Sequence, residues 1–245
     1  MIQHIGHVCE VVRYPVKSMA GVITDSAFLG WHGLAGDRRF AFRRLEDASG
    51  FPWLTASRLH ELILYQPIGA GQTTGEPLPT HVRTPGGIEL DLRGDELTKE
   101  IAERFGRPVQ LMELKNGIFD DASISVISRA TIAAISSQAE VPIDTRRFRA
   151  NIVVEMANPE PFAEDEWMGG TLLFGESEPH AAVSVTTRDV RCVMINLDPG
   201  TAEANARLLK SAVQLNANNA GIYGTVVQTG RIHVGQPVSL VQSRA

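Results

Sequence analysis

The segment whose residue types point most clearly to a chemical function ends at Cys192. The residues RDVRC (188–192) follow an apolar run over residues 181–187, which predicts a strand. An arginine beside a cysteine favours the thiolate, which is both a nucleophile and a ligand for soft metals. A lone cysteine in apolar surroundings is more often an unreactive buried residue. The segment holds no histidine that could support acyl transfer, so metal ligation by Cys192 is the functional hypothesis it favours.

Basic residues come before two other predicted strands. Arg38 and Arg39 begin an apolar run, and strand alternation directs their side chains to opposite faces. An inward arginine would need a carboxylate or a bound anion, whereas a surface salt bridge is the default alternative. The segment RRFR (146–149) concentrates three arginines in an acidic chain. It favours anion binding about as much as it favours an exposed basic loop.

A third candidate is the segment YPVKS (14–18), which follows a predicted strand. Proline restricts the turn, and the Lys17 ammonium with the Ser18 hydroxyl could bind a phosphate or another anion. A solvated turn explains the same residues. The segment gains weight only if other parts of the chain place cations beside it.

Composition excludes several classes of protein. The 245 residues carry a net charge of −5, which argues against nucleic acids or anionic membranes as partners. Two cysteines are too few for a four-cysteine iron–sulfur cluster built by this chain alone. Signal-peptide, membrane-span, dinucleotide-binding, P-loop, serine-hydrolase and zincin motifs are all absent from the sequence. We expect a soluble protein of a reducing compartment, the cytoplasm.

Short apolar runs, many with alternating polarity, must position these residues. Three helices are expected: one from Asp95 to the Gly106-Arg107-Pro108 stop, one after Ser128, and one over residues 201–213. The Gly/Pro-rich residues 67–85 are expected to form a long loop. Many strands and few helices predict a mainly β fold with a few helices (α+β), a barrel or sandwich, divided near residue 112. The predicted strands cover residues 8–13, 38–43, 62–65, 88–92, 109–112, 123–128, 151–155, 171–174, 181–187, 224–228 and 237–242.

These motifs, taken in order, resemble the MOSC family, which is named for the C-terminal domain of molybdenum cofactor sulfurase. The resemblance covers nearly the whole chain and is closest to two-part members such as the mitochondrial amidoxime-reducing component and bacterial YcbX-like proteins. It implies an N-terminal MOSC β-barrel domain over residues 1–112 and a MOSC β-barrel domain over residues 113–245. The motifs that carry it are YPVKSMAG, GLAGDRRF, FRANIVVE, PFAEDEW, RCVMINLDP and GIYGTVVQTGRIHVGQPVSL.

The resemblance also implies a molybdenum cofactor whose metal is ligated by Cys192, the one residue given a catalytic role. The cofactor would lie between the two domains, because its contacts come from both halves of the chain. No iron–sulfur cluster is expected in this chain. The residues implied to bind the cofactor are Lys17, Ser18, Arg38, Asp121, Ala122, Ser123, Arg149, Asn151, Arg191 and Tyr223.

The implied activity is the reduction of small N-hydroxylated compounds, such as amidoximes, hydroxylamines or N-hydroxylated bases, as in N-reductive detoxification. A separate electron-donor protein would be required, of the ferredoxin, cytochrome b5 or flavin reductase type. Two alternatives stay open. Cys192 could carry a persulfide in a sulfur-carrier protein, or the chain could bind the cofactor without turnover.

Overall fold

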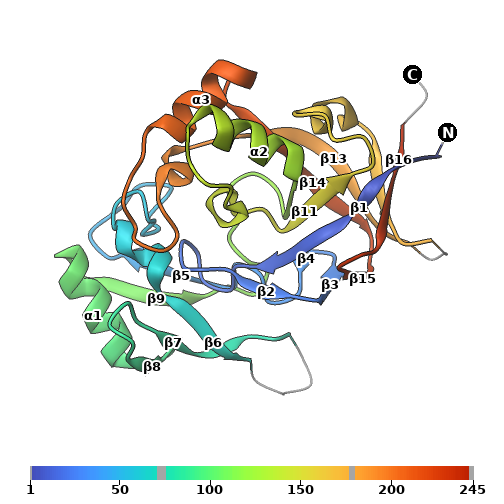
Figure 1. Ribbon diagram of the computed structural model, residues 1–245. Helices are drawn as coiled ribbons and strands as arrows, with labels where there is room; N and C mark the ends of the chain where they lie inside the picture. Colours follow the sequence, from blue (N-terminus) through green and yellow to red (C-terminus); the bar gives the residue numbers. More distant parts are fainter. Residues whose placement is uncertain (1, 71–75, 177–179, 243–245) are drawn as a thin grey trace.

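A computed structural model describes residues 2–70, 76–176 and 180–242 of the chain (Figure 1). Its largest element is a closed barrel of seven strands, in which β1 pairs with both β16 and β11 and so joins the two ends of the sheet. Six of these strands come from the second half of the chain, and β1 comes from the N-terminus. In barrel order they are β11 (Ile152–Met156), β10 (Ile124–Ser128), β14 (Asn219–Gln228), β13 (Ala181–Val190), β12 (Thr171–Phe174), β16 (Pro237–Val241) and β1 (Ile2–Arg13).

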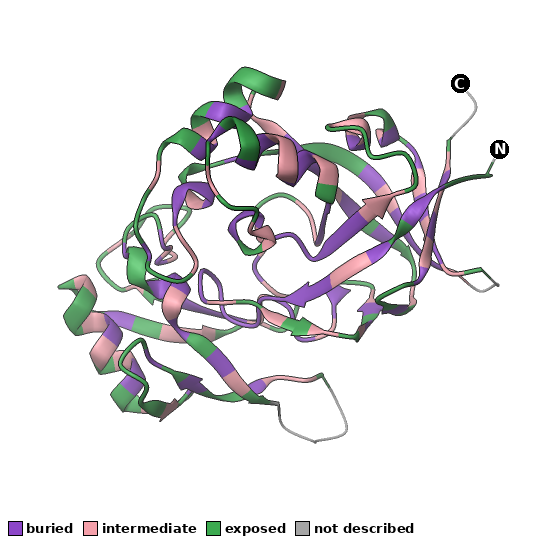
Figure 2. Cartoon of the chain, in the orientation of Figure 1, coloured by how far each residue is buried: buried purple, intermediate pink, exposed green. Residues whose placement is uncertain are grey.

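Apolar side chains on alternate strand positions fill the barrel, among them Val8, Val126 and Val183. Two helices, α2 (Arg129–Gln138) and α3 (Arg207–Asn216), cover one side of it and pack together through a second apolar cluster. The Ser128 hydroxyl caps α2 by accepting a hydrogen bond of 3.0 Å from the Thr131 amide. Figure 2 shows that buried residues follow the barrel strands and the inner faces of these helices.

The described residues between 39 and 113 form a second lobe beside the barrel, with its own apolar core around Phe40, Leu62 and Ile101. A small sheet of β3 (Ser26–Gly30), β4 (Gly33–Leu34) and β15 (Gly230–His233) lies outside the lobe, and β2 (Val22–Thr24) extends β1. The lobe contains the pair β5 (Phe40–Arg44) and β9 (Val109–Glu113), the sheet β6 (Gln66–Ala70), β7 (Pro79–Arg83) and β8 (Glu89–Asp91), and helix α1 (Asp95–Phe105).

The mainly β fold with three α-helices among the described residues confirms the expected fold class. A second closed barrel is not found in the described part of the chain, where the strands outside the seven-stranded barrel form only small sheets or, in β2, extend its edge. The described residues also contain no helix that is both long and apolar enough to cross a membrane.

Three local predictions were wrong. Residues 62–65 lie mostly in the 3-10 helix η1 (His60–Leu64), because a short apolar run is buried equally well in either conformation. The expected loop over residues 67–85 contains the antiparallel pair β6 and β7, whose prolines lie near strand ends where they disturb few hydrogen bonds. The third helix begins at Arg207 rather than at residue 201, after a turn in which the Asp198 carboxylate accepts from backbone amides.

Candidate functional site

The candidate site is a cavity of about 390 Å³, the thiol cavity, at the place where β13 ends and the second lobe approaches the barrel. Segments far apart in the sequence contribute to its wall: the turn after β1, the loop before β10, the turn before β11, the end of β13 and the middle of β14. The residues that line it include Lys17, Ser18, Arg38, Phe51, Asp120, Arg147, Arg149, Asp189, Arg191, Cys192, Val193, Met194 and Tyr223.

Cys192 is a free cysteine with an exposed side chain at this cavity. It follows β13 and caps the 3-10 helix η4 (Val193–Asn196) with an extended backbone. The residue before it, Arg191, is buried, and its Nε and Nη1 atoms donate hydrogen bonds of 2.7 Å to the carbonyls of Ala220 and Phe148. Arg191 therefore anchors the turn that presents the thiol to the cavity.

A buried ion pair lies behind the same turn. Asp189 is 3% exposed, and its carboxylate lies 2.9 Å from Nη2 of Arg191. The Ser125 hydroxyl donates a 3.1 Å hydrogen bond to it. Burial raises the pKa of Asp189 to about 6, against the opposing effects of Arg191 and Ser125. The pKa of the neighbouring Tyr223 is also raised, by burial and then by Asp189, so its hydroxyl stays protonated and can donate.

The opposite wall carries basic side chains, two of them on residues whose backbone has a positive φ angle. Ser18, Arg38 and Arg149 have φ values of 66°, 48° and 53°, three of the eight positive values found for non-glycine residues in the described part of the chain. Such conformations cost on the order of 1 kcal/mol each and persist where the surrounding structure enforces them. All three residues line the thiol cavity.

The Tyr14 ring supports both guanidinium groups, at 5.2 Å from Arg38 and 4.3 Å from Arg149. Arg38 forms an ion pair with Asp37 and donates to the Arg149 carbonyl at 3.3 Å. No ion pair joins Arg149 to a carboxylate within the described ranges. Burial and the nearby Arg38 lower the pKa of Arg149, partly offset by Tyr14. A bound anion would relieve this repulsion.

Lys17 completes the basic wall. It is 6% exposed, and its Nζ atom lies 2.8 Å from the Asp120 carboxylate, which is itself largely exposed. Burial lowers the pKa of Lys17, and Asp120 opposes this shift. Five basic side chains and two carboxylates line the cavity, so its net charge favours an anionic group.

The structure brings most of the sequence-predicted residues to this cavity: Lys17, Ser18, Arg38, Arg149, Arg191, Cys192 and Tyr223 line it. Asn151 lies beneath the wall, where its side chain accepts from Arg38 and from the Ser125 amide and donates to the Val12 carbonyl and to Asp37. It positions Arg38. Asp121, Ala122 and Ser123 precede β10 and do not line the cavity.

Sequence reasoning gave no role to Asp120, to Asp189 or to the apolar wall around Phe51 and Met194, and it selected Arg147 only as part of the RRFR segment. Only Asp189 carried a usable signal, since it is an acid among the apolar residues of a strand end. The described residues contain no cluster of three or more histidine, cysteine or acidic side chains placed to hold a metal ion. A metal here would take one thiolate from the protein and its other ligands from a bound cofactor.

Comparison with known proteins assigns the family. The MOSC domain model matches residues 102–239, which include Arg149, Cys192 and Tyr223. The chain belongs to the MOSC domain family. The resemblance deduced from the sequence motifs is confirmed.

Relatives of this MOSC-domain protein extend the match beyond the domain model. The chain is 31% identical to mitochondrial amidoxime-reducing component 1 of Xenopus laevis, over 97% of this chain and 82% of that protein. It is 25% identical to the human protein of the same name, over 98% of this chain and 85% of that protein. The YUAD protein from Bacillus subtilis shares the fold, with a TM-score of 0.50 at 15% identity over 100% of this chain and 98% of that one.

Proposed function

We propose that this MOSC-domain protein is a molybdenum-cofactor-dependent reductase of small N-hydroxylated compounds such as amidoximes, hydroxylamines and N-hydroxylated bases. The observation that carries the proposal is an exposed cysteine at a cavity lined by five basic side chains. A soft thiolate beside an anion-binding wall suits a cofactor that combines a metal with a phosphate. Relatives named amidoxime-reducing components support the substrate class.

The donor set fits this group residue by residue. The Cys192 thiolate would ligate the metal, and Arg191 would hold its turn in place. Lys17, Ser18, Arg38, Arg149 and Tyr223 offer charged or hydroxyl donors for the phosphate and the pterin, and Asn151 positions Arg38. Contacts from the backbone of residues 121–123 stay a prediction.

When bound, a molybdenum cofactor supplies the two-electron removal of oxygen from the substrate. The chain's own residues would bind the cofactor and orient the substrate. Arg38 and Arg149 neutralise negative charge, while Tyr14 keeps their guanidinium planes in place. Phe51 and Met194 give the cavity an apolar side that limits water around the reacting atoms. Asp189 remains salt-bridged to Arg191 and so holds the Cys192 turn from behind.

Metal and pterin analysis tests the proposal, using protein purified from a host that makes the cofactor. Near-stoichiometric molybdenum and oxidised pterin are expected in the wild type, and both are expected to be lost in Cys192→Ala. Reduction of benzamidoxime by reduced methyl viologen should fall at least about 100-fold in Cys192→Ser, because the soft ligand is gone. Cys9→Ser is the matched control and should keep full turnover. Full turnover in Cys192→Ser would contradict the ligand assignment.

A sulfur carrier is the second candidate function, and the exposure of the Cys192 thiol favours it. It predicts a persulfide on Cys192 and no stoichiometric molybdenum. A non-catalytic cofactor-binding module would instead retain molybdenum and pterin but reduce no N-hydroxylated compound even with a strong reductant.

The proposal includes three further features. The chain divides into an N-terminal region over residues 1–112 and a MOSC domain over residues 113–245, and its location is cytoplasmic. A separate electron-donor protein delivers electrons, of the ferredoxin, cytochrome b5 or flavin reductase type. Steady turnover with one purified donor and no artificial reductant would identify it.

A further inference from the structure

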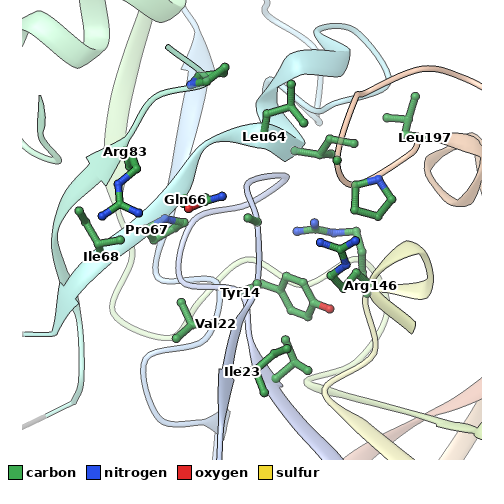
Figure 3. A pocket seen from close by; sticks show the side chains of 18 of the residues that line it. Tyr14, Val22, Ile23, Leu64, Gln66, Pro67, Ile68, Arg83, Arg146 and Leu197 are labelled. Carbon is green, nitrogen blue, oxygen red and sulfur yellow. The ribbon is translucent and has the colours of Figure 1, made fainter. Parts of the chain in front are cut away.

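A second and larger cavity, the interlobe cleft, lies between the barrel and the second lobe and has a volume of about 610 Å³ (Figure 3). The barrel contributes the end of β1, strand β2 and the turns over residues 146–149 and 197–200. The second lobe contributes η1, β6 and the β7–β8 hairpin. Clefts between lobes are common ligand sites in proteins, and this volume suits a small organic molecule.

The two cavities are neighbours, and most of their lining residues differ. Arg147, Arg149 and Met194 line both and form a common wall. Cys192 and Lys17 line only the thiol cavity, and residues of the second lobe's β6 strand line only the interlobe cleft. The cleft is therefore a separate space that meets the proposed cofactor site at two arginines.

Charge in the interlobe cleft has a single sign. Four arginines and no aspartate or glutamate line it. Arg149 has no carboxylate ion-pair partner among the residues that the structure describes. The other three arginines bind carboxylates that lie outside the wall: Arg83 binds Glu89 at 2.8 Å, Arg146 binds Asp144 at 2.7 Å and Arg147 binds Asp198 at 2.5 Å. A guanidinium has five N–H donors, so each pair leaves donors for a ligand.

The Tyr14 side chain supplies a second and independent observation. Tyr14 is 2% exposed and lines the cleft, and no hydrogen bond of its hydroxyl to another described residue is found. Its hydroxyl end points toward Arg146 (Figure 3). Burial raises the pKa of this hydroxyl to about 12, so it is a donor at neutral pH. A ligand oxygen in the cleft could accept a hydrogen bond from this hydroxyl.

Apolar side chains line the rest of the cleft. Val22, Ile23, Leu64 and Leu197 are among them, and Ile68 lies beside Arg83, on the far side of the cleft from Arg146 (Figure 3). Ile23 is 62% exposed. An apolar group bound here would cover surface that now faces water.

We propose that the interlobe cleft binds a small organic carboxylate with an apolar body. The carboxylate accepts hydrogen bonds from the Tyr14 hydroxyl and from Arg146 and pairs with the charge of Arg149. The apolar body lies along Ile23, Leu64 and Ile68. This site is distinct from the thiol cavity and does not depend on the function proposed for it.

Isothermal titration of the full chain with 4-phenylbutyrate tests the proposal, with 4-phenylbutanol and inorganic phosphate as matched probes. The carboxylate is expected to bind with one site per chain, and at least about tenfold more tightly than either control. Equal affinity for the alcohol would overturn the anion site, and equal affinity for phosphate would overturn the apolar half. Tyr14→Phe keeps the ring that supports Arg149 and should weaken carboxylate binding about tenfold, with no effect on the alcohol.

Two variants decide which cavity is occupied. Ile23→Glu places a carboxylate at the open side of the interlobe cleft, and Val193→Glu does the same at the thiol cavity. Both positions are at least half exposed, so both variants should fold, and melting curves will check this. Ile23→Glu should weaken 4-phenylbutyrate binding at least about tenfold by like-charge repulsion, and Val193→Glu should leave it within about twofold. The reverse pattern would assign the ligand to the thiol cavity and overturn the proposal.

Discussion

The thiol cavity and the interlobe cleft share three residues yet are built differently. The thiol cavity rests on buried ion pairs and on strained backbone, with Arg191 and Asp189 both less than a tenth exposed. The interlobe cleft depends on arginines such as Arg83 whose ion pairs face water. Buried, hydrogen-bonded charges hold geometry closely, while exposed pairs contribute little and move freely. The first arrangement suits a tightly held cofactor, and the second suits a ligand that exchanges.

The largest expected effect is the loss of folding stability when the buried ion pair of the thiol cavity is broken. Arg191→Met leaves the Asp189 carboxylate without its ion-pair partner and the carbonyls of Ala220 and Phe148 without the guanidinium donor. The free energy of unfolding should fall by about 3 kcal/mol or more in urea titrations. Arg188→Met is the control, since Arg188 is half exposed, and it should change stability by less than about 0.5 kcal/mol. Equal losses in the two variants would remove the distinction between buried and exposed pairs.

Protonation of Asp189 gives the next effect. Its pKa of about 6 in the folded state lies above the ordinary aspartate value of about 3.9, so the folded state binds the proton more tightly than the unfolded state. The stability that this provides is complete below about pH 4 and is lost as the pH rises through 6, in total about 3 kcal/mol. Asp189→Asn should remove this part of the pH dependence, measured as unfolding free energy from pH 4 to 8. Parallel curves for Asp189→Asn and the wild type would contradict the assignment.

Arg149 tests the wall that the two cavities share. Arg149→Met removes a guanidinium with no carboxylate ion-pair partner in the described structure. We expect weaker binding of 4-phenylbutyrate and weaker retention of pterin, each by about tenfold, which corresponds to about 1.4 kcal/mol. Pterin retained after dialysis and titration of the carboxylate measure the two effects. An effect on one ligand alone would show that the cavities use the shared wall unequally.

The smallest effect belongs to the exposed side of the cleft. Arg83→Ala breaks a pair in which both side chains are about half exposed. Its effect on the free energy of unfolding should stay within about 0.5 kcal/mol, and carboxylate binding should weaken only about twofold. A loss of stability as large as that of Arg191→Met would mean that the cleft is as firmly built as the thiol cavity.

Much of the fold could be predicted because the barrel strands show a local alternation of apolar and polar residues. Strands β10, β11, β12, β13 and β16 lie where the apolar runs predict them. Strands β6 and β7 were missed because prolines and glycines within them suggest a loop, although pairing with β8 and burial of Val82 stabilise them as a sheet. Helix η1 was missed because four apolar residues do not distinguish a strand from a helical turn.

By itself, the sequence determined the family and the mainly β class, and it selected Cys192 beside Arg191 as a candidate, because these depend on neighbouring residues and on motif order. The tertiary structure decided which side chains meet. It brought Asp120 rather than Asp121 to the thiol cavity and placed Asn151 beneath it. It also opened the interlobe cleft between β2 and β6. Cavities form where segments distant in sequence pack imperfectly. A local pattern of polar and apolar residues does not show which distant segments will meet.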